Sequence, residues 1–275
     1  MESALEYDIA LAQLAWQVEM GCAEATCEAP VDRFAAEIEA RAAAAARAQA
    51  PAASAHAPAV KGGGAPAPVM AEPQIDPVAE AAALAKGCAD LAALEAAMAS
   101  FAHCDLRRGA RRMCFAAGHP AARVMVIGEA PGREEDRSGA VYEGPAGRLL
   151  DRMLAAIDLS RDAQVSAQGA YLTYALPWRP PQGRDPHEGE IACMAPFVRR
   201  HVELVAPQVL LLLGDVAVQS LFGAARDKGI GKGWAEACGR PALAITAPEY
   251  LLTHPAGKRG AWHDLLTFKA RLAAL

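Results

Sequence analysis

The sequence predicts an α/β protein: a three-layer α/β/α sandwich on a four-stranded, mostly parallel sheet, with a helical N-terminal arm. Two observations support this. Stretches with the period of an amphipathic helix alternate with four apolar runs of strand length, at residues 124–127, 170–175, 209–213 and 242–246. Strands and helices that alternate in this way build a sheet covered by helices on both faces.

The predicted domain occupies only the C-terminal part of the 275 residues. Residues 1–47 contain helix-like runs, including an amphipathic stretch at residues 2–20, and form an acidic arm. Residues 48–77 are rich in Ala, Pro and Gly, a composition that cannot build a core and is typical of a flexible linker. We therefore place the folded domain at residues 78–275.

Charge and cysteine content limit the classes to which the protein can belong. The first hundred residues carry 14 acidic and 5 basic side chains, whereas the remainder carries 22 basic and 18 acidic ones. A mildly basic domain is compatible with a DNA partner. The seven cysteines include no CxxC pair, and the sequence shows no secretory signal or membrane span. We therefore expect reduced thiols or metal ligands rather than a disulfide framework, no membrane association and a cytoplasmic location.

The most informative stretch is residues 123–150, RVMVIGEAPGREEDRSGAVYEGPAGRLL. An apolar strand enters a turn built on Gly128, Pro131 and Gly132, an acidic segment follows, and a Gly-Pro-Ala-Gly sequence opens an amphipathic helix. Ligands of open α/β sheets bind at the carboxyl ends of the strands. We therefore expect the segment from Glu129 to Asp136 to face a crevice rather than to be buried.

This stretch closely resembles the first motif of family 4 of the uracil-DNA glycosylase superfamily, GE-(A/G)-PG-x-x-ED followed by G-x-P-F-V-G-x-A-G-x-L-L. The resemblance implies that Glu135 or Asp136 handles the attacking water and that Tyr142 stands in place of the stacking Phe. It also implies that the turn after the strand lines the base pocket, through Gly128, Glu129, Ala130 and Pro131.

A second string, LPWRPPQGRDP, resembles the family's ITN-x-x-x-CRPP-x-NR-x-P. In this register Tyr174 replaces the Asn that reads the uracil amide edge. The four positions that carry cluster cysteines in the family are here Phe101, Cys104, Trp178 and Cys193. Since cubane clusters are held by four thiolates, we expect no iron–sulfur cluster, and no other metal or cofactor.

The family's last motif, His-Pro-(Ala/Ser)-x-Leu-Leu-Arg, resembles part of TAPEYLLTHPAGKRGAWHDLL, in one of two registers. An ungapped register places Ala247 at the His position and Thr253 at the Arg position. A rival register takes His254-Pro255-Ala256 as the motif but requires a deletion before Trp262. The resemblance and the basic side chains give a set of candidate DNA contacts: Arg179, Arg184, Leu251, Leu252, His254, Lys258 and Arg259.

The resemblance therefore implies a DNA glycosylase that hydrolyses the N-glycosidic bond of uracil in DNA, with other deaminated bases as further substrates, and so initiates base excision repair. Two alternatives stay open. The substituted Asn and His positions are compatible with a catalytically inactive DNA-binding relative. The acidic arm is compatible with an interaction protein that recruits a repair partner.

Overall fold

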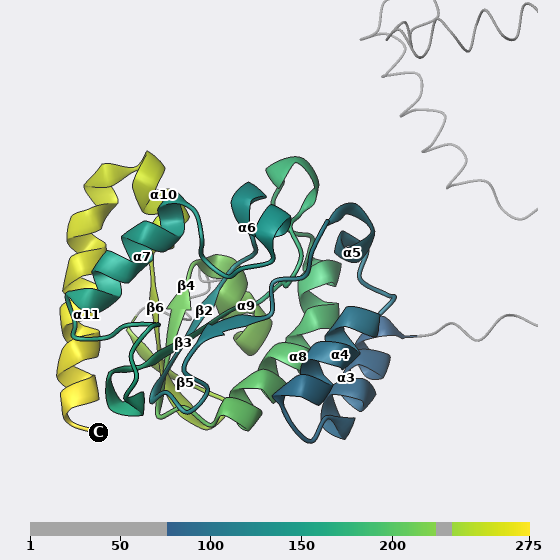
Figure 1. The fold of residues 1–275 in the computed structure, drawn as a ribbon, viewed down its shortest axis with the longest axis horizontal. Helices are drawn as coiled ribbons and strands as arrows, with labels where there is room; N and C mark the ends of the chain where they lie inside the picture. Colours follow the sequence, from purple (N-terminus) through teal and green to yellow (C-terminus); the bar gives the residue numbers. More distant parts are fainter. Residues whose placement is uncertain (1–75, 224–232) are drawn as a thin grey trace, which may run out of the picture. The chain divides into compact units, whose positions relative to one another are not determined.

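The computed structural model describes residues 76–223 and 233–275 (Figure 1). The predicted arm and nearly all of the linker lie outside the described residues, so their organisation and the boundary at residue 78 stay predictions.

The core of the domain is one mixed sheet of six strands in the order β1-β3-β2-β4-β6-β5. Its four central strands run parallel to one another. They match the four predicted strands: β2 (Val124–Gly128), β3 (Ala170–Tyr174), β4 (Val209–Leu213) and β6 (Arg240–Ile245). The α/β class is thus confirmed, but the sheet has six strands rather than the expected four.

The two additional strands pair antiparallel at the two edges of the sheet. They are β1 (Ala116–Gly118) and β5 (Trp234–Ala237). Their sequences, AAG and WAEA, contain no β-branched residue and no apolar run, so they lack the usual sequence features of a strand. Pairing with β3 and β6 defines them instead.

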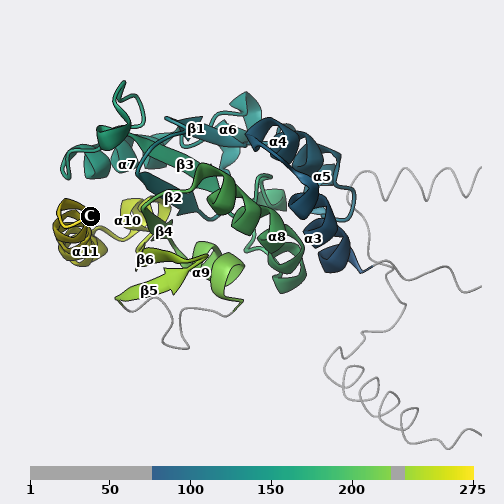
Figure 2. The ribbon, with the colours of Figure 1, turned by 90° about the horizontal axis from the view of Figure 1, so that it is seen from below.

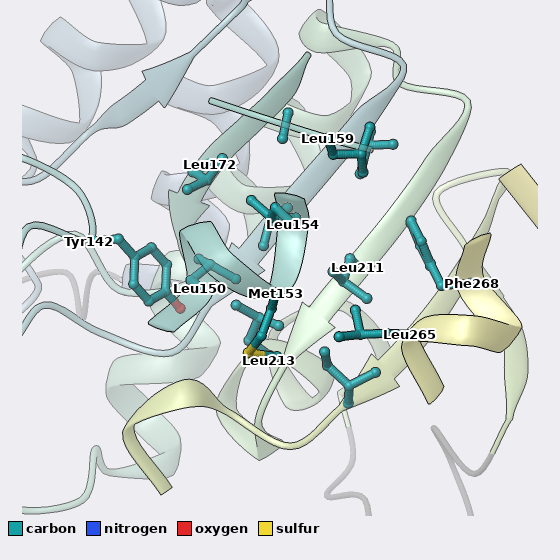
Figure 3. Packing of buried hydrophobic residues seen from close by; sticks show 14 of the residues in the cluster. Tyr142, Leu150, Met153, Leu154, Leu159, Leu172, Leu211, Leu213, Leu265 and Phe268 are labelled. Atoms are coloured by element: carbon teal, nitrogen blue, oxygen red, sulfur yellow. The ribbon is translucent and has the colours of Figure 1, made fainter. Parts of the chain in front are cut away.

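Helices α7 (Pro145–Ala155), α10 (Pro248–Thr253) and α11 (Lys258–Ala273) cover one face of the sheet (Figures 1 and 2). Their buried side chains pack against the strand residues that point to this side, and Figure 3 shows Leu150, Met153, Leu154, Leu265 and Phe268 beside Leu172, Leu211 and Leu213. In β2, Val124 and Val126 belong to this cluster. Alternate residues of a strand point to opposite faces, so Met125 and Ile127 point away from it.

The opposite face is covered by α8 (Glu188–Val205) and α9 (Asp215–Phe222). Val198 and Val202 of α8 and Val218 of α9 pack there in one buried cluster with strand residues that include Met125 and Ile127. Helices on both faces of the sheet confirm the three-layer architecture.

A third hydrophobic cluster joins the N-terminal helices to the first half of α8. It brings together α3 (Pro77–Gly87), α4 (Leu91–Ser100), α5 (Leu106–Gly109) and α8 residues such as Phe197. Residues 77–100, which are rich in Ala and Leu, form two helices rather than one, because Asp90 ends the intervening loop and caps α4 by accepting from the Ala93 N–H at 2.8 Å. No helix in residues 76–223 and 233–275 has the length and hydropathy needed to cross a bilayer.

Candidate active site

A cleft of about 790 Å³ opens where the four parallel strands end. Each central strand leads into one part of the cleft wall. Glu129 follows β2, the segment around Arg179 and Arg184 follows β3, and Asp215 begins α9 directly after the end of β4. Glu249 follows β6, and the first turns of α6 (Arg133–Ser138) and α7 complete the lining. This is where an open α/β sheet binds its ligand.

The first carboxylate of the cleft, Glu129, is fixed against the start of α9. Its Oε1 accepts from the Val216 N–H at 3.1 Å. Gly214 permits this approach, because its φ is 88° and a Cβ there would lie 2.4 Å from Glu129 Oε1. Burial raises the pKa of Glu129, and hydrogen bonds from the backbone of Val216 and Asp215 partly oppose this shift. Glu129 thus stands at the strand end in a fixed orientation.

Glu135 lines the cleft and also ties together the two ends of the loop around it. Oε2 accepts from the Gly132 N–H at 3.1 Å, and Oε1 accepts from Glu143 and Gly144 at 3.1 and 3.2 Å. Three backbone donors to one carboxylate hold it in a fixed position. Asp136 lies next to it in sequence but not in the cleft, and its Oδ1 accepts from the Arg111 N–H at 2.8 Å.

The segment from Glu129 to Glu135 lines the cleft, but the expectation that the segment as far as Asp136 is not buried needs correction. Its acidic part forms the helix α6, and the side chains of Glu135 and Asp136 are only 6% and 7% exposed. Of these two candidate water-handling groups, Glu135 lies in the cleft wall and Asp136 holds the Arg111 segment.

Tyr142 and Tyr174 pack on each other beneath the cleft. Their ring centroids are 4.7 Å apart, and the Tyr174 hydroxyl accepts from the Tyr142 N–H at 3.0 Å. Both side chains are 2% exposed, and Figure 3 shows Tyr142 beside Leu150 in the core. The Tyr142 hydroxyl is buried with no hydrogen-bond partner among the described residues, and burial raises the pKa of both phenols.

The tyrosine pair changes the expected base pocket. A Cβ at Gly128 would lie 2.0 Å from the Tyr142 hydroxyl, so glycine is needed at this strand end. Ala247 is also buried, in the same core cluster. Glu129, Ala130 and Pro131 line the cleft, whereas Gly128, Tyr142, Tyr174 and Ala247 do not.

The candidate DNA contacts fall into different environments. Arg179, Arg184 and Leu252 line the cleft. Arg184 forms a bidentate ion pair with Glu190, at 2.5 and 3.0 Å, which together with a hydrogen bond from the His187 N–H lowers the pKa of Glu190. Leu251, in contrast, is 1% exposed and packs in the core, because the inward face of α10 points toward α7 and α11. It is therefore not an accessible DNA contact in this structure.

His254, Lys258 and Arg259 are exposed and lie outside the cleft. His254 ends α10, where its ring stacks on Tyr250 at 4.1 Å and contacts the Thr253 hydroxyl at 2.9 Å. Ala247, at the other end of α10, lies two residues after the end of β6, whereas His254 lies beyond α10. In the ungapped register the His position of the last motif is thus close to the strand end.

Sequence reasoning missed Glu249. It lies in the first turn of α10, is exposed to the cleft and faces Glu129 and Glu135. Partial removal of water by the cleft walls raises the pKa of Glu249 to about 7, with a smaller contribution from those two carboxylates. The available signal was an acidic residue directly after the proline of the last motif.

The four positions related to cluster cysteines converge in the third hydrophobic cluster. Phe101, Cys104, Trp178 and Cys193 are all at most 3% exposed there, and the Cys193 thiol donates a hydrogen bond to the Glu190 carbonyl oxygen at 3.2 Å. Two thiols and two large apolar rings do not match the four-thiolate ligand set of a cubane cluster. The residues present therefore do not fit such a cofactor.

Comparisons of the sequence with known proteins find uracil-DNA glycosylases. A Type-4 uracil-DNA glycosylase of Archaeoglobus fulgidus is 37% identical over 119 residues, which cover 43% of this chain and 57% of the relative. A Type-4 uracil-DNA glycosylase of Sulfurisphaera tokodaii is 36% identical over 106 residues, which cover 38% of this chain and 46% of the relative. A Type-5 uracil-DNA glycosylase of Pyrobaculum aerophilum is 30% identical over 110 residues, which cover 37% of this chain and 48% of the relative.

The chain thus spans about half the length of the curated relatives it matches. The family model described as the Uracil DNA glycosylase superfamily matches residues 115–266, from the edge strand β1 to the closing helix α11. Because this match covers more than half of the chain, the protein belongs to the uracil-DNA glycosylase superfamily.

Proposed function

We propose that this protein is a DNA glycosylase that hydrolyses the N-glycosidic bond of uracil in DNA and thereby initiates base excision repair. The observation that carries the proposal is the cleft at the strand ends, whose lining includes the carboxylates of Glu129 and Glu135 and the arginines of the segment after β3. Such a cleft can accept an extruded nucleotide, its base and its phosphates together. Extrusion costs a few kcal/mol and is easiest at mismatched or single-stranded sites.

The arginines supply the contacts to the DNA backbone in this proposal. Arg179 and Arg184 line one wall of the cleft, and Arg184 is held in a fixed orientation by Glu190. Phosphate contacts position a nucleic acid without reading its sequence. Leu252, which is 40% exposed at the cleft edge, is suited to fill the space that the extruded base leaves.

Glu135 is the group we assign to the attacking water. The C1′–N bond breaks with its electron pair on the base, the water oxygen bonds to C1′, and the carboxylate takes the proton or stabilises the sugar cation. Three backbone hydrogen bonds preorganise Glu135 for this role. Glu129 is held across the cleft, while Asp136 supports the loop from outside the cleft.

The altered base pocket favours relaxed selectivity. Ala247 offers no side-chain donor to the departing base, and the Tyr174 hydroxyl already accepts from the Tyr142 backbone. A tyrosine hydroxyl cannot match both edges of the uracil amide as an Asn does. We therefore propose that xanthine and hypoxanthine are further substrates beside uracil.

Single-turnover excision from single-stranded oligonucleotides that each contain one uracil, xanthine or hypoxanthine tests the proposal. We expect wild type to release uracil and Glu135→Gln to be about 10²- to 10⁴-fold slower, as for a lost general base. Glu188→Gln makes the same charge change outside the cleft and should keep the wild-type rate. If wild type releases none of the three bases but binds the DNA, the protein is an inactive DNA-binding relative.

A repair-protein partner for the acidic arm is a separate proposal. Residues 1–75 carry 10 acidic and 4 basic side chains, which repel phosphate, so the arm should not add to DNA affinity. Removal of these residues should leave soluble expression and DNA binding intact and abolish capture of a repair protein. A tenfold loss of DNA affinity in the truncated protein would instead make the arm part of the DNA-binding surface.

A further inference from the structure

We propose that Glu249 is the residue that donates a hydrogen bond to the departing base, acting as a neutral carboxylic acid. This inference rests on the proposed glycosidase function and names the group that replaces the donor missing at Ala247. The base leaves with the electron pair of the broken C1′–N bond, so negative charge develops on its ring carbonyl oxygens. A donor aimed at such charge is usually the largest single catalytic contribution.

The position of Glu249 supports this assignment. It is exposed to solvent and lines the cleft together with Glu129 and Glu135, so a base held between these groups can reach its carboxyl. Ala247, two residues earlier, is buried in the core and supplies no side-chain donor. Glu249, which lies on the same short helix, thus reaches the cleft, whereas Ala247 does not.

A second observation links Glu249 to the base side of the cleft. The Tyr142 hydroxyl is fully buried, has no hydrogen-bond partner among residues 76–223 and 233–275, and lies against Gly128. Among the charged groups that raise the pKa of this phenol, Glu249 acts most strongly, ahead of Glu129 and Glu135. The charge of Glu249 also raises the pKa of Tyr174, so both phenols of the pair lie within its electrostatic range.

The protonation state follows from the surroundings. Removal of water and the negative charges of Glu129 and Glu135 raise the pKa of Glu249 to about 7, and its own backbone N–H partly opposes the shift. The packed helix α7 carries Arg148, Asp151 and Arg152, and none of them lines the cleft. The same holds for Lys258 and Arg259 of α11, while the arginines of the cleft are Arg133, Arg179 and Arg184.

A raised pKa means that the proton stays on Glu249 below about pH 7 and leaves as the pH rises through that value. The neutral acid donates a hydrogen bond, whereas the carboxylate only accepts and repels the developing anion. Excision should therefore decline above about pH 7, roughly tenfold per pH unit once the carboxylate predominates.

The first test is the pH profile of single-turnover excision of uracil by wild type, Glu249→Gln and Glu249→Ala. Gln keeps a donor at every pH, so Glu249→Gln should stay within about tenfold of wild type at pH 6 and lose the decline above pH 7. Glu249→Ala should be about 10²- to 10³-fold slower at pH 6. Wild-type rates and an unchanged profile in both variants would overturn the inference while the proposed glycosylase function stands.

A binding measurement keeps the inference testable even if wild type releases no base, which would refute the proposed function alone. The probe is an oligonucleotide with 2′-fluoro-2′-deoxyuridine, in which fluorine destabilises the sugar cation and blocks cleavage, compared with the same strand containing thymidine. We expect the preference of wild type for the uracil strand to weaken between pH 6 and pH 8, and that of Glu249→Gln to stay constant. The same pH dependence in Glu249→Gln or Glu249→Ala would exclude a role for this carboxyl.

Discussion

The hydroxyl of Tyr174 accepts a hydrogen bond of 3.0 Å from the backbone N–H of Tyr142, which joins the end of β3 to the loop before α7. Tyr142 has a positive φ of 55°, an uncommon conformation for a residue other than glycine. Gly147 lies immediately beneath, where a Cβ would be 1.7 Å from the Tyr142 carbonyl oxygen. The loop is thus held in position by contacts with Tyr174, Gly147 and Gly128.

Tyr174→Phe tests this contact. Removal of the acceptor leaves the buried Tyr142 N–H unpaired, so we expect the free energy of unfolding to fall by about 1–3 kcal/mol. Urea unfolding of the variant and of Tyr250→Phe, whose side chain is 53% exposed, provides the measurement and its control. Equal stability of wild type and Tyr174→Phe would show that the hydrogen bond does not hold the loop.

The two adjacent acidic residues of α6 should respond differently to loss of charge. Asp136→Asn weakens the hydrogen bond from Arg111, so we expect about 1–3 kcal/mol lower stability and a single-turnover rate within about tenfold of wild type. Glu135→Gln should mainly lower the rate, because Glu135 lies in the cleft and Asp136 does not. The reverse pattern, a rate loss confined to Asp136→Asn, would reassign the water-handling role.

These residues show how far the sequence defines the site. Glu129 and Glu135 were identifiable because the turn and its glycines form one continuous motif. A buried Tyr174 was one of two open interpretations of its strand, but the burial of Tyr142 was not predictable, because it depends on two rings that meet across the end of the sheet. Glu249 was missed because the cleft walls that remove water from it, and the carboxylates of Glu129 and Glu135, belong to segments distant in sequence.

In the fold, too, features that are local in sequence were predictable, whereas features that depend on distant partners were not. Apolar runs such as that of β4 identified the four parallel strands, since a strand buried on both faces is apolar throughout. The edge strands β1 and β5 carry Ala, Gly and Glu, and only their pairing with β3 and β6 makes them strands. Local composition cannot reveal such partners.

The third cluster should be stabilised by packing in place of a metal. Phe101 packs edge-to-face on Phe197 at 5.3 Å and is 2% exposed, so Phe101→Ala should lower the free energy of unfolding by about 3–5 kcal/mol. Chemical unfolding and iron analysis of the purified wild type provide the measurements. Stoichiometric iron with the visible absorbance of an iron–sulfur cluster would contradict the prediction.

His201 should make stability depend on pH. Burial lowers the pKa of His201 to about 4, and its Nε2 lies 2.8 Å from the Tyr171 hydroxyl. In the unfolded chain this histidine binds a proton near pH 6.5, whereas the folded protein binds it only near pH 4. The free energy of unfolding is therefore highest above pH 6.5 and falls as the pH drops toward 4, by about 2 kcal/mol between pH 7 and pH 5.

Urea unfolding of wild type, His201→Gln and His263→Gln at pH 7 and pH 5 measures this effect. His263 is exposed and serves as the control. We expect His201→Gln to lose about 2 kcal/mol less than wild type between the two pH values, and His263→Gln to behave as wild type. Equal pH dependence in all three proteins would mean that carboxylates alone cause the change.

Helix α8 belongs to two hydrophobic clusters, with Ile191, Met194 and Phe197 in the one beneath α3 and α4, and Val198, Val202 and Val205 in the one against the sheet. The N-terminal helices therefore have their own packing, distinct from that of the central strands. Such a layer can open as a cooperative unit at a lower free energy than global unfolding. Native-state hydrogen exchange would then divide this domain into two stability levels, with α3 and α4 exchanging before β2 and β4 and the boundary running through α8.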